Sequence, residues 1–179
     1  MKQNHLWPIF NYSDIHSHVP GKNRVLSVDF ENNDVDLPDD QAFTLGVHPW
    51  FADRVVDWEM FERNLVKPNI VGIGEAGLDT FKGPAQEVQL PVFERQIELA
   101  EKYRLPLIIH SVRSNHKILE LKKRYSPEVP WVIHGFRGNL DQAQQLMAAG
   151  LHLSLGKLYN LEVGNLHHPL IHRETDELI

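Results

Sequence analysis

The chain has 179 residues, of which 42% are apolar, a formal net charge of −6 at pH 7, and no cysteine. This is enough apolar material for one domain with a substantial core, and no apolar stretch is long enough to cross a membrane. The lack of cysteine excludes disulfides and thiolate metal sites. The acidic balance argues against binding nucleic acid by bulk electrostatics, although bound divalent cations could supply positive charge.

Short apolar runs recur along the chain and alternate with helical patterns. The runs predict eight strands, at 13–16, 25–28, 43–47, 70–74, 105–110, 130–134, 151–155 and 170–174. Apolar residues at helical spacing predict four helices between them, at 53–66, 87–103, 116–125 and 140–149. The last of these follows Asn139, a good N-cap, and stops at Gly150. Such alternation is typical of a parallel sheet.

Eight strands in this order predict an α/β fold, a TIM-type (β/α) barrel that forms one domain over 1–179. We expect a distorted, minimal barrel with several outer helices missing, because typical barrels run to about 250 residues. The link from His18 to Val25 is too short for a crossover helix, so the strand at 25–28 is a candidate for an antiparallel orientation. The segment 159–169 holds at most one helical turn. Only three residues follow Asp176, as expected of a C-terminally truncated barrel.

Histidines and carboxylates stand at the ends of several predicted strands. His16 and His18 are separated by one residue, so on a strand they share a face. The other candidates each end a separate apolar run: Glu75, His110, His134 and Asp176. The C-terminal ends of barrel strands meet at one face, where such barrels build their active sites. We therefore expect the six side chains to form one cluster.

Imidazole and carboxylate ligands suit zinc, manganese, magnesium or iron. His16 and His18 with one carboxylate would leave an open position for water, as in catalytic metal sites. His110 and His134 could hold a second ion, and Glu75 could bridge both. Two such ions clamp the oxygens of a displacement and lower the pKa of bound water. Asp176 could ligate the first ion and take the proton from that water.

Further histidines and one arginine are weaker candidates. His48, in the run GVHPW, is interpreted as lining the pocket behind the ligands, while helix capping or packing against Trp50 remain alternatives. Arg137 is a candidate for binding a phosphate, and the alternative is an ordinary exposed loop arginine. The remaining histidines follow no repeated pattern and are expected at the surface: His5, His116, His152, His167, His168 and His172.

The chain resembles the TatD family of metal-dependent hydrolases, or TatD-related DNases, within the amidohydrolase-type barrels. The matching runs occur in family order: DIHSH at 14–18, GVHP at 46–49, GIGEAGLD at 72–79, 93–100 with Gln96, 106–110, HGF at 134–136 and ETD at 174–176. The resemblance implies a distorted TIM barrel, two divalent metal sites and phosphodiester hydrolysis. It also implies two ligand groups: His16, His18, Glu75 and Asp176 around one metal, and Glu75, His110 and His134 around the other.

The chain also departs from the family pattern. Family members are longer, and they have a helix after the first histidine pair and another after the last aspartate. They usually carry arginine two residues after the fifth-strand histidine, where this chain has Val112, with Arg113 next.

The sequence therefore predicts a metal-dependent hydrolase that cleaves phosphodiester bonds in DNA, or a small phosphate ester, by metal-activated water. One alternative is an amidohydrolase-type enzyme acting on another ester or amide. Such relatives commonly use lysine at the position of Glu75, which disfavours this reading. The other alternative is an inactive metal-binding barrel. We expect a cytoplasmic location and no membrane partner, and the sequence specifies no oligomeric state.

Overall fold

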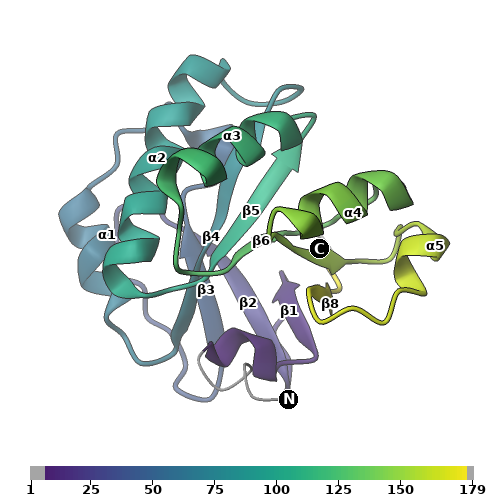
Figure 1. Cartoon of the computed structure of the whole chain (residues 1–179). Coiled ribbons are helices and arrows are strands. Elements are labelled where there is room, and N and C mark those ends of the chain that lie inside the picture. The colour runs from purple at the N-terminus through teal and green to yellow at the C-terminus, as the bar shows by residue number, and fades with distance from the viewer. Residues whose placement is uncertain (1–6, 177–179) are drawn as a thin grey trace.

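The computed structural model describes residues 7–176, which form one parallel sheet of eight strands with helices along its outer side (Figure 1). The strands pair in chain order, and every neighbouring pair is parallel. Their bounds are β1 (Asp14–Ser17), β2 (Arg24–Asp29), β3 (Ala42–Gly46), β4 (Ile70–Asp79), β5 (Leu107–Val112), β6 (Trp131–Ile133), β7 (His152–Leu155) and β8 (Ile171–Arg173). The predicted α/β barrel is confirmed.

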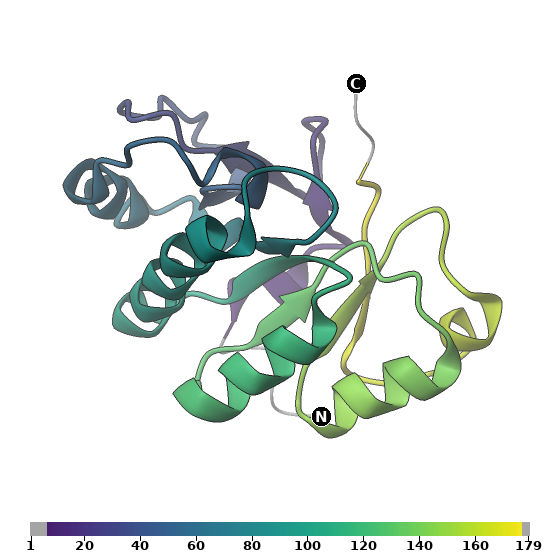
Figure 2. The ribbon, with the colours of Figure 1, turned by 90° about the horizontal axis from the view of Figure 1, so that it is seen from above.

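The helices are α1 (Trp58–Leu65), α2 (Gln86–Tyr103), α3 (Asn115–Tyr125), α4 (Leu140–Ala148) and the single turn α5 (Leu161–Gly164), with 3-10 turns η1 (Pro8–Asn11) and η2 (Pro49–Phe51). Seen from above, the longer helices flank the curved sheet on its outer side (Figure 2). The prediction for 53–66 began too early, because the Asp57 side chain accepts the Met60 N–H at 3.0 Å and caps α1 there.

The outer layer is incomplete where the sequence predicted it to be. Within the described residues no helix separates β1 from β2 or β2 from β3. The loop at 30–41 instead packs Val35 and Leu37 against the core. Asn64 of α1 fixes this loop, since its Oδ1 accepts the Val35 N–H at 3.0 Å.

The expected antiparallel orientation of β2 is wrong. Asp14 of β1 pairs in parallel with Arg24 of β2. β1 has only four residues, so the six-residue link can retrace its length as extended chain, at about 3.3 Å per residue, without a crossover helix. Asn23 closes the link, because its Oδ1 accepts the Ser13 N–H at 3.3 Å and its carbonyl accepts the Ser13 hydroxyl at 3.2 Å.

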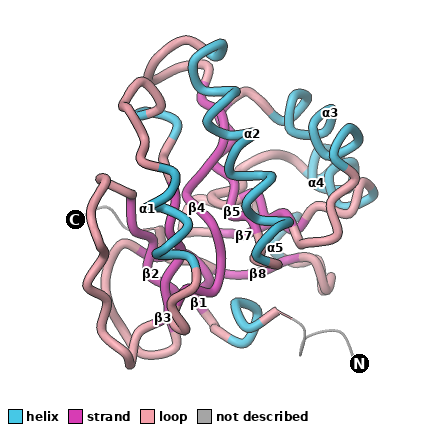
Figure 3. The backbone as a smooth tube through the Cα atoms, turned by 90° about the vertical axis from the view of Figure 1, so that its left-hand side faces the viewer, coloured by secondary structure: helices cyan, strands magenta, loops and turns pink. Residues whose placement is uncertain are grey.

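Hydrogen bonds after β8 bring the last strand against the first. Thr175 donates its N–H to Asp14 Oδ1 at 3.1 Å and its hydroxyl to Asp14 Oδ2 at 2.8 Å. The next residue, Asp176, donates its N–H to the His16 carbonyl at 3.3 Å. The tube in Figure 3 shows β8 lying close to β1. This seam places Asp176 beside the first histidine pair.

Alternation along the strands directs the candidate residues into the barrel. Ile108 and Val132 belong to the buried cluster that also holds Ile9 of η1. Successive strand residues point to opposite faces. His110 and His134 lie two residues beyond Ile108 and Val132, so they point into the same interior.

β4 is longer than predicted: it runs past Glu75 to Asp79. Two glycines let it lie against β5. A Cβ on Gly74 would fall 2.5 Å from the Ile108 carbonyl oxygen, and one on Gly77 would fall 2.1 Å from that of His110. Both have φ values near +145°, at 147° and 145°, which side chains rarely adopt. The glycines of the GIGEAGLD run therefore fix how closely Glu75 approaches β5.

None of the helices in 7–176 is long and apolar enough to span a membrane.

Candidate metal centre

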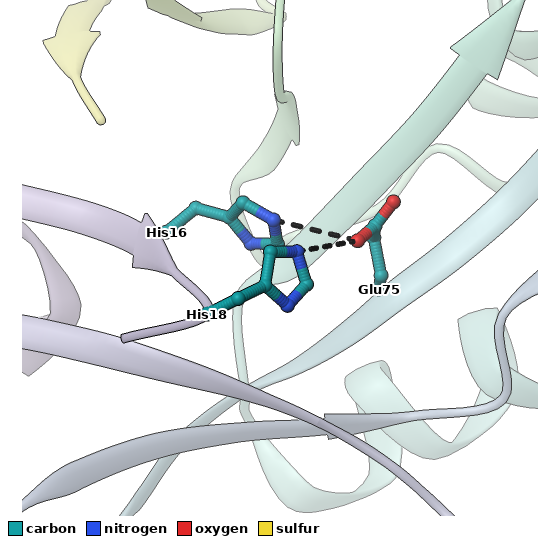
Figure 4. A group of neighbouring side chains, drawn as sticks. All are labelled: His16, His18 and Glu75. Atoms are coloured by element: carbon teal, nitrogen blue, oxygen red, sulfur yellow. Dashed lines mark ion pairs between the residues drawn. The ribbon is translucent and has the colours of Figure 1, made fainter. Parts of the chain in front are cut away.

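The six side chains predicted as metal ligands converge at the C-terminal ends of the strands, around Glu75. One part of the cluster is drawn in Figure 4, where His16 and His18 point toward the Glu75 carboxylate. His16, Glu75 and His134 are buried, whereas His18 and Asp176 are partly open. Among the described residues, three groups of side chains lie close enough to hold a metal ion: His16, His18 and Glu75; His16, His134 and Asp176; and His48, Glu75 and His110.

The first group surrounds one oxygen of Glu75. Oε2 lies 3.4 Å from His16 Nε2 and 3.7 Å from His18 Nε2. Asp176 Oδ1 lies 3.6 Å and 3.5 Å from the same two nitrogens. A tetrahedral ion with bonds of about 2.0–2.2 Å places its ligand atoms about 3.3–3.6 Å apart. The four distances therefore match a shared ion better than direct hydrogen bonds.

The surroundings of the His16 side chain also indicate a metal site. Its side chain is fully buried, and neither ring nitrogen has a hydrogen-bond partner among the described residues. A buried polar nitrogen without a partner is costly. A divalent cation between His16, His18, Glu75 and Asp176 would satisfy Nε2 of His16, so this donor set fits a metal.

The second group surrounds the other oxygen of Glu75. Oε1 lies 2.8 Å from His110 Nδ1 and 2.8 Å from His134 Nε2. The two nitrogens are 3.4 Å apart. These carboxylate distances are hydrogen bonds, so an ion here would require the side chains to separate slightly. Glu75 thus presents one oxygen to each histidine pair.

The pKa values of the histidines and of Glu75 in this cluster are shifted in opposite directions. Burial and the neighbouring His134 oppose protonation of His16, yet the Asp176 and Glu75 carboxylates outweigh them and raise the pKa of His16 to about 9. Burial likewise opposes protonation of His134, but the Glu75 charge holds its pKa well above the ordinary value. Burial would raise the pKa of Glu75, but His134 and His110 hold it well below normal. The histidines thus face this carboxylate with positive charge.

His48 both caps a helical turn and packs against Trp50, the two alternatives expected for it from the sequence. Its Nδ1 accepts the Trp50 N–H at 3.2 Å and caps η2, and its ring packs edge-on against Trp50 with centroids 4.6 Å apart. Because Nδ1 accepts, the proton resides on Nε2, which donates to Glu75 Oε1 at 2.9 Å. His48 therefore acts as a donor toward Glu75.

Sequence reasoning missed two carboxylates that lie behind the second histidine pair. Asp79 Oδ2 lies 2.9 Å from His110 Nε2 and accepts the Trp50 indole N–H at 2.7 Å. Glu174 Oε1 lies 3.7 Å from His134 Nδ1 and accepts the Gly135 N–H at 2.6 Å. Carboxylates commonly orient metal-binding histidines in this way. Both residues belong to sequence runs already singled out: Asp79 ends GIGEAGLD and Glu174 begins ETD.

Two cavities meet at Asp176. One, of about 360 Å³, contains the ligand cluster and is walled by His48, Trp50 and Phe51. The other, of about 460 Å³, is lined by Arg137, Lys157 and Tyr159. Arg137 is exposed and stands at the edge of this second cavity.

Together, the parallel barrel and a cluster of histidines and carboxylates at the strand ends define a metal-binding α/β barrel. The family model described as TatD related DNase matches residues 32–176. The chain belongs to this family.

Similarity to individual proteins supports the same family assignment. The chain is 34% identical over 119 residues to the uncharacterized metal-dependent hydrolase YjjV of Escherichia coli, covering 63% of this chain and 45% of that protein. It is 32% identical to Deoxyribonuclease Tat-D of Schizosaccharomyces pombe (67% and 45%) and 30% identical to the 3'-5' ssDNA/RNA exonuclease TatD of Erwinia billingiae (63% and 44%). The chain thus spans about half the length of the relatives it matches.

The crystal structure of YjjV superposes with a TM-score of 0.65 at 28% identity, over 74% of this chain and 56% of that one. The family and fold predicted from the sequence are confirmed.

Proposed function

We propose that this protein is a metal-dependent hydrolase that cleaves phosphodiester bonds in DNA. The observation that carries the proposal is the position of Glu75, whose two oxygens face two separate histidine pairs. A carboxylate in that position can join two ions a few ångströms apart, the arrangement used for in-line displacement at phosphorus.

The proposed centre holds two divalent ions, with zinc, manganese and magnesium as candidates. His16, His18 and Asp176 would hold the first ion with Glu75 Oε2. The second would lie between His110 Nδ1, His134 Nε2 and Glu75 Oε1. Asp79 and Glu174 support this assignment, because each lies toward the far ring nitrogen of its histidine and leaves the near one for an ion. When bound, the ions would lower the pKa of a water and neutralise phosphate charge.

The protein's own groups then divide the remaining tasks. Asp176 is the proposed base: the neighbouring His16 and His18 rings outweigh its burial and lower its pKa, so it is ionised, and its position at both cavities lets it receive a proton from water. The His48 Nε2 proton restrains Glu75, and the His48 ring lines the cavity in which a substrate phosphate would lie. Arg137 and Lys157 provide positive charge at the neighbouring cavity for a second phosphate.

The names of two relatives, a deoxyribonuclease and an ssDNA/RNA exonuclease, favour nucleic acid as the substrate. Amidohydrolase-type enzymes that act on amides or other esters commonly have lysine at the position of Glu75. The glutamate therefore disfavours such a substrate for this chain.

The proposal is tested by hydrolysis of single-stranded DNA with purified protein. We expect EDTA to abolish cleavage and manganese, magnesium or zinc to restore it. Glu75→Gln should lose activity, whereas Glu162→Gln, at an exposed position of α5, should keep it. EDTA-resistant cleavage, or full activity in Glu75→Gln, would overturn the proposal. Failure to cleave DNA with both ions bound would favour the inactive barrel.

A further inference from the structure

A rigid turn beside the centre presents an aromatic ring to solvent. The turn follows β4, and Phe81 at its tip is 77% exposed. Arg113, which follows β5, lies with its guanidinium 5.6 Å from the Phe81 ring centroid. The next residue in the turn, Lys82, holds its ammonium 3.4 Å from the Trp50 ring centroid. An exposed aromatic ring thus lies beside one cation, and the residue after it in the turn carries a second.

The exposure of Phe81 is imposed by the backbone. Asp79 Oδ1 accepts the N–H of Phe81 at 2.8 Å and that of Lys82 at 2.9 Å. Thr80 donates its N–H to the Val112 carbonyl at 3.2 Å and so ties the turn to the end of β5. These bonds anchor the backbone on both sides of Phe81, whose ring is solvent-exposed at this position.

The same carboxylate joins the turn to the candidate metal centre. While Asp79 Oδ1 holds the turn, Oδ2 lies 2.9 Å from His110 Nε2 and accepts from the Trp50 indole. His110 and Trp50 both line the cavity around Glu75. Phe81 is therefore fixed relative to the reacting position through a single side chain.

We propose that Phe81 is a stacking platform for an unpaired base of a single-stranded nucleic acid whose backbone crosses the ligand cluster. Aromatic rings flanked by cations bind single strands, because every base has a π face and the cations attract the phosphates. In a duplex the base faces are covered by their neighbours, so the platform selects single strands. This inference rests on the proposed function and assigns Phe81 as a residue that holds the strand.

The test measures binding separately from cleavage. Affinity for a fluorescein-labelled oligothymidylate is measured by anisotropy in EDTA, where the DNA stays intact. Phe81→Ala should weaken binding by about 5- to 150-fold, the range for losing one stacked base, and Phe81→Trp should retain it. The control Val55→Ala removes an apolar side chain that is 89% exposed and should bind normally.

The cations and the chemistry give further readouts. Lys82→Gln and Arg113→Gln should each reduce the salt dependence of binding by about one phosphate contact. Hydrolysis of methyl 4-nitrophenyl phosphate with manganese should be unchanged in Phe81→Ala, since this diester has no base. If the wild-type protein does not hydrolyse this diester, the result would count against the proposed function. The measured effect of Phe81→Ala on oligothymidylate binding would still stand.

Three outcomes would overturn the platform. The first is that Phe81→Ala binds oligothymidylate as tightly as the wild type. The second is that Phe81→Leu binds as tightly as the wild type, which would indicate apolar contact without stacking. The third is that Phe81→Ala loses as much affinity for duplex DNA as for oligothymidylate.

Discussion

Acid should destabilise this protein through His172, the middle residue of β8. The His172 ring is stacked on Phe10 with centroids 4.4 Å apart, and its Nε2 lies 2.8 Å from His152 Nδ1. Burial lowers the pKa of His172 to about 4. Burial, with His172, Lys122 and His168 nearby, lowers that of His152 to about 3. Both residues were expected at the surface, whereas the structure shows them half-buried.

The sign and size of the effect follow from linkage. The unfolded chain binds a proton at His172 below about pH 6.5, whereas the folded protein binds it only near pH 4. Stability therefore falls as the pH drops below 6.5, and this loss is complete below pH 4. At about 1.4 kcal/mol per pH unit, the loss at pH 5 is about 2 kcal/mol.

The assay compares urea unfolding at pH 7.5 and pH 5.0, with EDTA present to remove metal linkage. His172→Phe keeps a ring against Phe10 but removes the proton site, so it should lose about 2 kcal/mol less than the wild type between the two pH values. His116→Phe, at an exposed position of α3, should behave like the wild type. Equal losses in the wild type and His172→Phe would refute the reasoning.

Other predictions concern the centre. Asp176→Asn should retain metal at the His110 side while turnover falls by roughly 10²–10⁴-fold, measured as hydrolysis at saturating manganese; full turnover would remove Asp176 as the base. Asp79→Asn should weaken metal binding by about 10- to 100-fold in calorimetry, because His110 loses its orienting carboxylate; unchanged affinity would make Asp79 a turn residue alone. Gly77→Ala should destabilise the fold by more than about 3 kcal/mol in urea, since its Cβ would fall 2.1 Å from the His110 carbonyl oxygen; a small effect would mean that β4 and β5 separate easily.

The sequence predicted the strands and the ligand cluster well because both depend on local alternation. His110 and His134 each end an apolar run, and period-two geometry sends them to the barrel interior. The roles of these residues as ligands, of Asp176 as base and of His48 and Arg137 toward substrate stay predictions, as does the cytoplasmic location.

What sequence reasoning missed depends on contacts between distant segments. The direction of β2 is set by the pairing of Asp14 with Arg24. Asp79 and Glu174 acquire their positions behind the histidines only when β4 and β8 are placed beside their neighbours in the barrel. His172 is partly buried because Phe10, far away in the chain, stacks on it. None of these contacts has a signature within a short window of sequence.

The central claim is that Glu75 joins two metal ions at a hydrolytic centre. The most direct test is electron paramagnetic resonance of the protein titrated with manganese. We predict that two equivalents bind and give the spectrum of a spin-coupled pair, and that Glu75→Gln loses the coupling. One equivalent at saturation, or two ions without coupling in the wild type, would contradict the account.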